Sequence, residues 1–322
     1  MVLKVVQAIT KKPKPIKMKN SISKLITWLL LLVVFAASCK KDSEPTIASP
    51  TATNVEIGTA NNRQGIRGRD FHLNADVIAG EKIKGVEVKI LQKAGQTYTA
   101  SWKLEMAWEQ YNGAKNTNVH KHFTIPADAP EGKYDFCFIV LDENGTKLEM
   151  KEDFTIIDAA NIPVDPKIGR DIFSRNGTMI YYMDTFVEQE LIFKKGHEFT
   201  AHAQVSEIKG DGILYTVLIK RKASYFPESV DKLDLNKAIV ISKVEHKGLP
   251  SASKVSTLKL VNGVYGGETI TIGAEKDGNE PTANLISGEK AWESGKYNLV
   301  ILYKNTTYNS STYKSIPVTI VY

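Results

Sequence analysis

The sequence predicts an all-β protein built of two β-sandwiches in tandem. Apolar and polar residues alternate with a period of two in many short runs, for example at residues 71–77, 133–140 and 214–220. Such alternation is typical of strands that bury one face. Gly, Asn, Asp and Pro separate the runs at intervals typical of a sandwich. An internal repeat then indicates that the sandwich occurs twice.

The repeat is carried by a strand that occurs once in each half of the chain. Residues 68–77 read GRDFHLNADV and residues 196–205 read GHEFTAHAQV, an offset of 128 positions. Further along each half, Gly-Lys-Tyr enters another apolar strand, at residues 132–134 and 295–297. A tyrosine at this point buries its ring while its hydroxyl bonds the backbone at the sandwich corner, as in immunoglobulin-like sandwiches. We therefore predict two tandem immunoglobulin-like sandwiches.

The N-terminal region has the pattern of a secretion signal. Lys19 and Lys24 precede an uncharged apolar run at residues 25–38, which is shorter than the roughly 20 residues of a membrane-spanning helix. The small residues that end the run precede Cys39, an arrangement that resembles the lipobox of bacterial lipoproteins, although Ala36 stands where those usually have Leu. The resemblance implies cleavage before Cys39 and its lipidation, and several acyl chains would anchor the protein stably. An uncleaved membrane helix is the alternative.

These signals set the expected organisation of the chain. Two prolines, Pro163 and Pro166, interrupt the strand pattern between the two halves and place the domain boundary there. The expected parts are a signal peptide at 1–38 (with Met18 as an alternative start), the lipidated Cys39 and a tether at 39–45, a first sandwich at 46–158 and a second at 159–322.

Charge and cysteine content narrow the classes of partner and chemistry. Seven lysines in residues 1–39 produce the net charge of +6, and the rest of the chain has 35 basic and 36 acidic residues. It therefore lacks the positive field that would attract nucleic acid. Cys137 is the single cysteine besides Cys39 and lies in the apolar run FCFIVL. We expect a buried, unreactive thiol and no disulfide within the folded part.

The first predicted sandwich resembles a known family. The matching residues are 45–47, the strand at 70–77, YNGAKNT at 111–117, VHKHFTIPADAPEGKYDF at 119–136 and the VLDENGTK turn at 140–147. They resemble the DUF4625 type, an uncharacterised lipoprotein family of the Bacteroidetes group, and the CKKD sequence at Cys39 is similar to lipoproteins of that group. The resemblance implies an immunoglobulin-like fold and a lipid-anchored location at the outer membrane, with the cell-surface face favoured over the periplasmic one. It implies no reaction.

Histidines on predicted strands form a candidate metal site. His120 and His122 are two positions apart on one strand, so both imidazoles point to the same face. His72, on the repeated strand, is the candidate third ligand for a Zn or Cu ion. The alternative is a polar outer strand face, in a protein without a cofactor. The HEFTAH sequence at 197–202 is one residue too long for the zinc-protease motif and is rejected.

Aromatic residues outside the strand pattern form a second candidate binding surface. Tyr303, Tyr308 and Tyr313 flank the polar sequence NTTYNSST in the second half, and Trp102 and Trp108 lie in the first. Aromatic faces beside hydroxyl and amide groups suit a sugar or a peptide. Core packing is the favoured alternative for the two tryptophans, and a solvated loop is the alternative for the tyrosines.

The leading functional prediction is a non-enzymatic binding or adhesion module, lipid-anchored at the outer membrane, with a glycan or a protein as its ligand. The end loops of such sandwiches carry function. The alternative is a metal-binding or metal-delivery lipoprotein that uses the strand histidines. A hydrolase ranks last because the sequence contains no catalytic motif.

Overall fold

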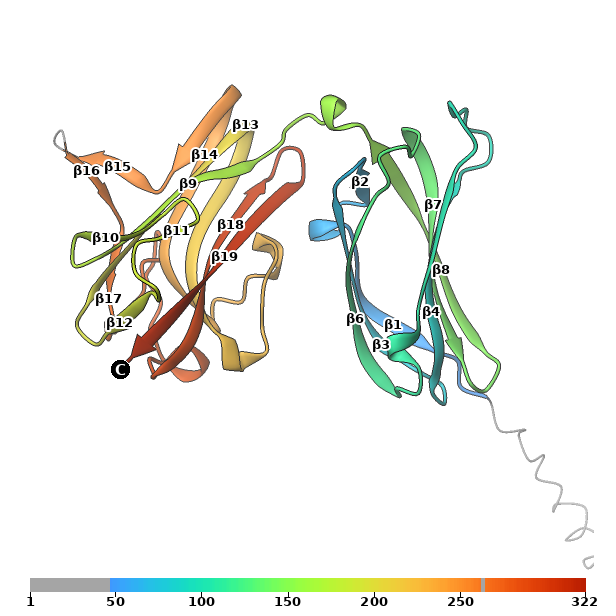
Figure 1. Ribbon diagram of the computed structural model, residues 1–322, viewed down its shortest axis with the longest axis horizontal. Helices are drawn as coiled ribbons and strands as arrows, with labels where there is room; N and C mark the ends of the chain where they lie inside the picture. The colour runs from blue at the N-terminus through green and yellow to red at the C-terminus, as the bar shows by residue number, and fades with distance from the viewer. Residues whose placement is uncertain (1–46, 262–263) are drawn as a thin grey trace, which may run out of the picture. The chain divides into compact units, whose positions relative to one another are not determined.

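The computed structural model describes residues 47–261 and 264–322, and these form an all-β structure, as predicted (Figure 1). The expected signal peptide, Cys39 and most of the tether lie outside the described residues. Within the described ranges, no helix combines the length and the apolar character needed to cross a membrane.

The first sandwich consists of a three-stranded and a five-stranded sheet. The three-stranded sheet has the order β1 (Thr51–Ile57), β3 (Asp70–Ile78), β6 (Asn116–Thr124). The five-stranded sheet has the order β2 (Gln64–Ile66), β8 (Lys147–Ile157), β7 (Gly132–Asp142), β4 (Ile83–Gln92), β5 (Lys103–Trp108). Short 3-10 helices lie at η1 (Thr59–Asn61) and η2 (Glu109–Tyr111). Alternate residues of β3, such as Phe71 and Leu73, are buried in the core between the sheets. Cys137 is buried and free, and its burial raises the pKa of its thiol.

The second half forms a nine-stranded sheet and a small hairpin. The main path of the large sheet is β11 (Thr185–Phe186), β10 (Thr178–Tyr182), β9 (Lys167–Arg175), β13 (Glu198–Lys220), β18 (Gly295–Asn305), β19 (Ser310–Val321), β12 (Ile192–Lys194). β14 (Ala238–Ser256) and β17 (Thr269–Thr271) also pair with β13, and β15 (Leu258–Val261) pairs with β16 (Val264–Gly267). The remaining 3-10 helices are η3 (Ala159–Asn161), η4 (Arg221–Ala223), η5 (Val230–Lys232) and η6 (Gly288–Lys290).

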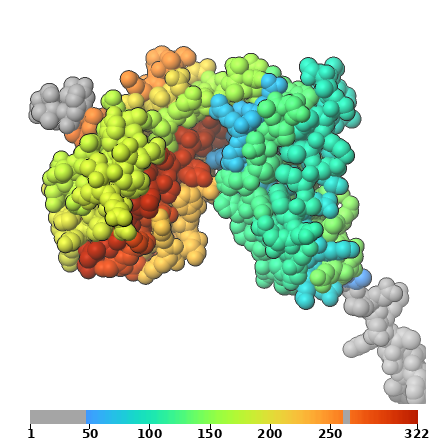
Figure 2. Space-filling model, viewed as in Figure 1, coloured from blue at the N-terminus to red at the C-terminus, as the bar shows by residue number. Residues whose placement is uncertain are grey.

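The long strand β13 organises this second half. Its first part, from Phe199 to Ser206, pairs with β9, and its last part, from Gly212 to Lys220, pairs with β18. One strand therefore serves two groups of neighbours, whose apolar faces share one core. The predicted boundary at 158/159 falls between β8 and β9. Figure 2 shows the C-terminal strands (red) at the surface beside the yellow-green residues of β9 to β12.

The corner tyrosines confirm the structural meaning of the repeat. The Tyr134 hydroxyl donates a hydrogen bond to the Pro130 carbonyl oxygen at 2.7 Å. The Tyr297 hydroxyl donates to the Glu293 carbonyl oxygen at 3.1 Å. Each tyrosine is buried and bonds the backbone four residues upstream, so the two halves are closed at the same corner by the same contact.

A segment of the second half covers the face of β13, β14 and β18 that is turned away from the main core. Residues 221–237, called the covering segment here, place Tyr225, Val230 and Leu233 against buried residues such as Val217 and Val300. These strands are therefore buried on both faces. This apolar contact fixes the loop that also carries Glu228.

Candidate functional site

Three histidines meet on the outer face of the three-stranded sheet. His72 on β3 pairs directly with His122 on β6, and His120 pairs with the neighbouring residue Asn74. Because side chains alternate between the faces of a strand, Phe71 and Leu73 enter the core while His72 points outward. The three imidazole centroids are 5.2 to 5.3 Å apart. The structure thus brings the three candidate histidines together.

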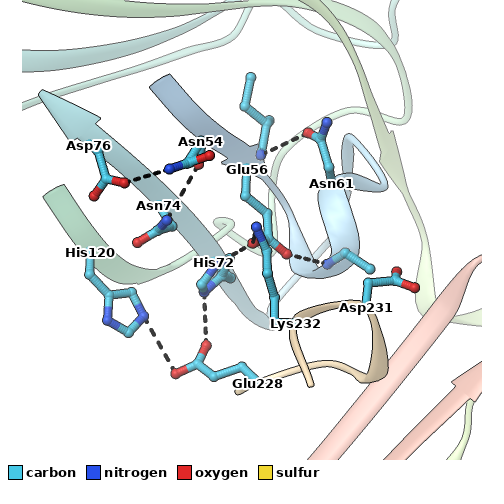
Figure 3. Close-up of polar contacts among 12 residues, drawn as sticks. Asn54, Glu56, Asn61, His72, Asn74, Asp76, His120, Glu228, Asp231 and Lys232 are labelled. Atoms are coloured by element: carbon cyan, nitrogen blue, oxygen red, sulfur yellow. Dashed lines mark hydrogen bonds and ion pairs between the residues drawn. The ribbon is translucent and has the colours of Figure 1, made fainter. Parts of the chain in front are cut away.

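The covering segment brings a carboxylate to the histidines, within the compact unit Ala48–Tyr322 (Figure 3). Glu228 Oε2 lies 2.9 Å from His72 Nδ1 and 3.1 Å from His122 Nε2. Glu228 Oε1 lies 3.4 Å from His120 Nε2. We call these four residues the histidine cluster. One ligand atom from each lies within 4.8 Å of the others, so the cluster can surround a single ion.

Four of the separations between these atoms are close to those around a small metal ion, and all of them are within 4.8 Å. Donors that each lie about 2.0 to 2.1 Å from a tetrahedral zinc ion are about 3.3 Å from one another. His72 Nδ1 and His122 Nε2 are 3.5 Å apart, and the Glu228 contacts range from 2.9 to 3.4 Å. Three imidazoles and one carboxylate form a donor set that zinc and copper both accept. Four protein donors are the number typical of a structural zinc site.

Two further carboxylates lie beside the outer nitrogens of two of the imidazoles. Asp70 Oδ2 lies 2.6 Å from His122 Nδ1, and Glu56 Oε2 lies 3.7 Å from His72 Nε2. In metal sites, a ligating histidine typically donates its other N–H to such a group, which orients the ring and raises its basicity. The nitrogens that face Glu228 are thereby left to face a shared ion.

The charges of the cluster compensate one another strongly. Burial alone would lower the pKa of His72, but hydrogen bonds and charges from Glu228 and Glu56 raise this pKa to about 9. Burial would raise the pKa of Glu228, but the His72 hydrogen bond and the nearby histidines lower it to about 2. The metal-free cluster is therefore an ion-pair network in which His72 is protonated at neutral pH. A metal ion would replace that proton at the same inward-facing nitrogen.

The other predicted site residues do not join the cluster as ligands. Tyr303 is fully buried in the second core, and its hydroxyl lies 3.0 Å from His246 Nε2. Its prediction as a ligand-binding residue is wrong, because its ring is used for core packing. Tyr308 is half-buried in the turn between β18 and β19, with Lys209 Nζ 4.9 Å from its ring.

The remaining three aromatic residues pack against their surroundings. Tyr313 stacks edge-on against Phe226 of the covering segment at 5.7 Å. Burial and the adjacent Glu228 carboxylate raise the pKa of the Tyr313 hydroxyl. This tyrosine therefore lies next to the cluster without being one of its ligands. Trp102 and Trp108 are half-buried against the first core. Core packing, the favoured alternative for these tryptophans, is what the structure shows.

Sequence reasoning did not identify the carboxylates of the site. Glu228 lies more than a hundred positions from the nearest histidine of the cluster, and nothing in its own sequence context distinguishes it. Asp70 did leave a signal, because it lies two positions before His72 on the same strand and therefore on the same face. An acidic residue at this spacing could have been read as a support for the metal ligand.

Comparisons with known proteins identify the first sandwich. Residues 37–157 match the family model described as "Domain of unknown function (DUF4625)". No curated protein matches the sequence. Similar solved structures include dimeric latent PorU from Porphyromonas gingivalis, with 11% identity and a TM-score of 0.29, covering 88% of this chain and 21% of that chain.

Two further similar structures are a carbohydrate-binding module of the β-sandwich superfamily and an activated alpha-2-macroglobulin from Escherichia coli. The first has 10% identity and a TM-score of 0.25, covering 66% of this chain and 85% of that chain. The second has 10% identity and a TM-score of 0.22, covering 85% of this chain and 24% of that chain. The family match is the informative comparison, because residues 37–157, which match the DUF4625 model, include all three histidines of the cluster.

Proposed function

We propose that the protein is a non-enzymatic binding protein that holds a divalent transition-metal ion, with Zn²⁺ as the first candidate and Cu²⁺ as the second. The observation that carries the proposal is the convergence of four donor atoms within 4.8 Å in the histidine cluster. Asp70 and Glu56, which lie beside the outer nitrogens of His122 and His72, also support it, because carboxylates in this position are typical of metal-ligating histidines.

Binding is favoured over catalysis by the composition of the cluster. With three imidazoles and Glu228 as ligands, the protein fills all four positions of a tetrahedral ion, whereas catalytic zinc sites keep one position for water. A binding role also suits a domain type with an immunoglobulin-like fold, whose function depends on the side chains it displays.

The proposal includes a location at the outer membrane, on the cell-surface side, with the lipid on Cys39 as the anchor. The N-terminal sequence pattern supports this part. We expect a labelled fatty acid to be incorporated into the wild-type protein but not into Cys39→Ala. Uptake of label by that variant would contradict the anchor.

Metal analysis of the purified chain from residue 40 onward tests the metal site. After incubation with zinc and exhaustive dialysis, the wild type should retain one equivalent, and His120→Ala/His122→Ala should retain much less. Asn116→Ala is the matched control, since this exposed residue occupies the same face of β6. Retention of neither zinc nor copper by the wild type would overturn the proposed function.

A further inference from the structure

The histidine cluster forms one wall of a cavity of about 400 Å³. His72, His120 and Glu228 of the cluster line it, together with other residues such as Asn74, Ser229 and Lys232. This volume is within the range of small-molecule sites. A metal ion in the cluster would therefore have empty, polar space beside it.

An unpaired hydroxyl marks the cavity as a ligand site. Ser229 is only 1% exposed and lines the cavity, yet its Oγ has no hydrogen-bond partner among the described residues. A buried polar group left without a partner destabilises the folded protein. Native structures rarely retain such a group without a reason. A ligand hydroxyl or carboxylate in the cavity would satisfy it.

The amide wall of the cavity is held in place before any ligand arrives. Asp76 accepts hydrogen bonds at 2.8 Å from the side-chain amides of both Asn54 and Asn118. The Asn118 amide also donates to Asn74 Oδ1 at 3.0 Å, and the Asn74 amide donates to the Asn54 carbonyl oxygen at 3.4 Å. The resulting network fixes the orientation of polar groups on this wall, which lowers the entropic cost of binding.

The charge of the cavity defines the class of ligand. Its ionised side chains are Glu56, Glu228 and Lys232, with Lys232 Nζ 3.1 Å from Glu56 Oε2. The charges of these three groups sum to −1, and a divalent ion in the cluster adds two positive charges beside them. Metal loading thus makes the cavity more favourable for a small anion.

We propose that the cavity binds a small hydroxylated carboxylate beside the metal ion, so that the protein holds metal and organic anion together. This inference rests on the proposed metal site. The carboxylate lies beside the positive charge of the metal ion and faces the Lys232 ammonium group, which also lines the cavity. The hydroxyl pairs with Ser229, and the carbon skeleton lies against Tyr225 and Phe226, which also line the cavity.

Calorimetric titration of the chain from residue 40 onward with L-malate tests this inference, with succinate as the matched anion that lacks the hydroxyl. Zinc content is measured before and after each titration, so that removal of the ion by the anion is detected. We expect zinc-loaded protein to bind malate at least tenfold more tightly than metal-free protein does, and to prefer malate over succinate.

Two variants assign the contacts. Ser229→Ala should retain zinc but lose the preference for malate, a change of about tenfold for one hydrogen bond. Lys232→Gln should weaken both anions about equally. Lys254→Gln is the control, since Lys254 is exposed on β14 and does not line the cavity.

The outcomes separate the two proposals. If the wild type retains no zinc or copper, the proposed function fails and this inference fails with it. If zinc is retained but neither anion binds, or if Ser229→Ala keeps the full preference for malate, this inference alone is overturned and the metal site stands.

Discussion

The repeated strands β3 and β13 bury equivalent side chains but carry different residues on their outer faces. Phe71 and Phe199 occupy equivalent positions in the repeat, and both are buried. On the outer side, His72 corresponds to Thr200, and a histidine occurs two positions later in the second copy, as His202. The duplication preserved what the sandwich needs for packing and left the outer faces free to diverge.

The two strand histidines show that the surrounding carboxylates, rather than the strand position, decide the chemistry. His72 has Glu228 and Glu56 beside it, and its pKa is raised to about 9. His202 is equally buried, but its nearest polar contact is the Thr257 hydroxyl at 3.4 Å. Burial and the charge of Arg170 lower the pKa of His202, so this ring stays neutral and serves the structure.

The largest difference between the two histidines should appear in stabilisation by zinc. At a free zinc concentration of 100 times Kd, wild type should gain about 2.7 kcal/mol of unfolding free energy. His72→Ala should lose nearly all of this gain, whereas His202→Ala should keep it even if its metal-free stability falls. Thermal melts with and without zinc measure both effects. An equal zinc-dependent shift in wild type and His72→Ala would remove His72 from the site.

Replacement of the carboxylate ligand should have the next largest effect. Glu228→Gln keeps the shape but removes the charge, and the three imidazoles remain. We expect one zinc ion to bind about a hundredfold more weakly, since a charged partner contributes about 1.5 to 3 kcal/mol. Asp231→Asn, in the same covering segment and paired with Lys304, is the control. Competition with a fluorescent chelator gives the affinities, and unchanged affinity in Glu228→Gln would exclude this residue as a ligand.

The repeat supplies a matched pair for the outer carboxylate. Asp70, which contacts His122, corresponds to Glu198 in the second copy. Asp70→Asn should weaken zinc binding by about 10- to 100-fold, the usual range for a group that orients a ligand. Glu198→Gln should change the zinc affinity by less than about twofold. Similar losses in the two variants would show that general electrostatics, and not orientation of His122, is responsible.

The buried neutral histidine should appear in the pH dependence of stability. The pKa of His202 is lower in the folded protein than its ordinary value of about 6.5, so the unfolded chain binds the proton more tightly. Its contribution to stability is complete above about pH 6.5 and is lost as the pH falls below that value. Chemical unfolding from pH 5 to 8 should therefore show a smaller acid loss in His202→Gln than in wild type. Parallel curves for the two proteins would contradict this assignment.

The smallest effect is expected from copying the key histidine into the second half. Thr200→His places a histidine on β13 at the position that corresponds to His72, but the neighbouring groups differ: Thr200 Oγ1 lies 2.7 Å from Thr269 Oγ1. Glu198 and His202 share this face of β13, but among the described residues no second group of converging donors occurs there, so we expect zinc stoichiometry to remain at one equivalent by metal analysis. A second bound ion would show that one histidine at this position is enough.

Much of the fold could be predicted because the alternation of buried and exposed residues along a strand is visible in a short stretch of sequence. The period of two gave the buried residues of β3 and β7, and the Gly-Lys-Tyr sequences located the corners closed by Tyr134 and Tyr297. The same rule placed His120 and His122 on one face. The polar turn nearby misled at Tyr303, whereas the period of two places this residue on the core-facing side with Tyr297 and Ile301, where its ring is buried.

By itself, the sequence determined the all-β class, the repeated strand with its corner tyrosine, and the shared face of His120 and His122. The tertiary structure decided that His72 lies opposite His122, because strand register depends on which strands pair. It also decided that Glu228 closes the cluster. That contact depends on the covering segment, whose apolar side chains pack on β13, β14 and β18 and so fix the position of Glu228. No local sequence pattern encodes this packing, because such burial is a property of the folded surface.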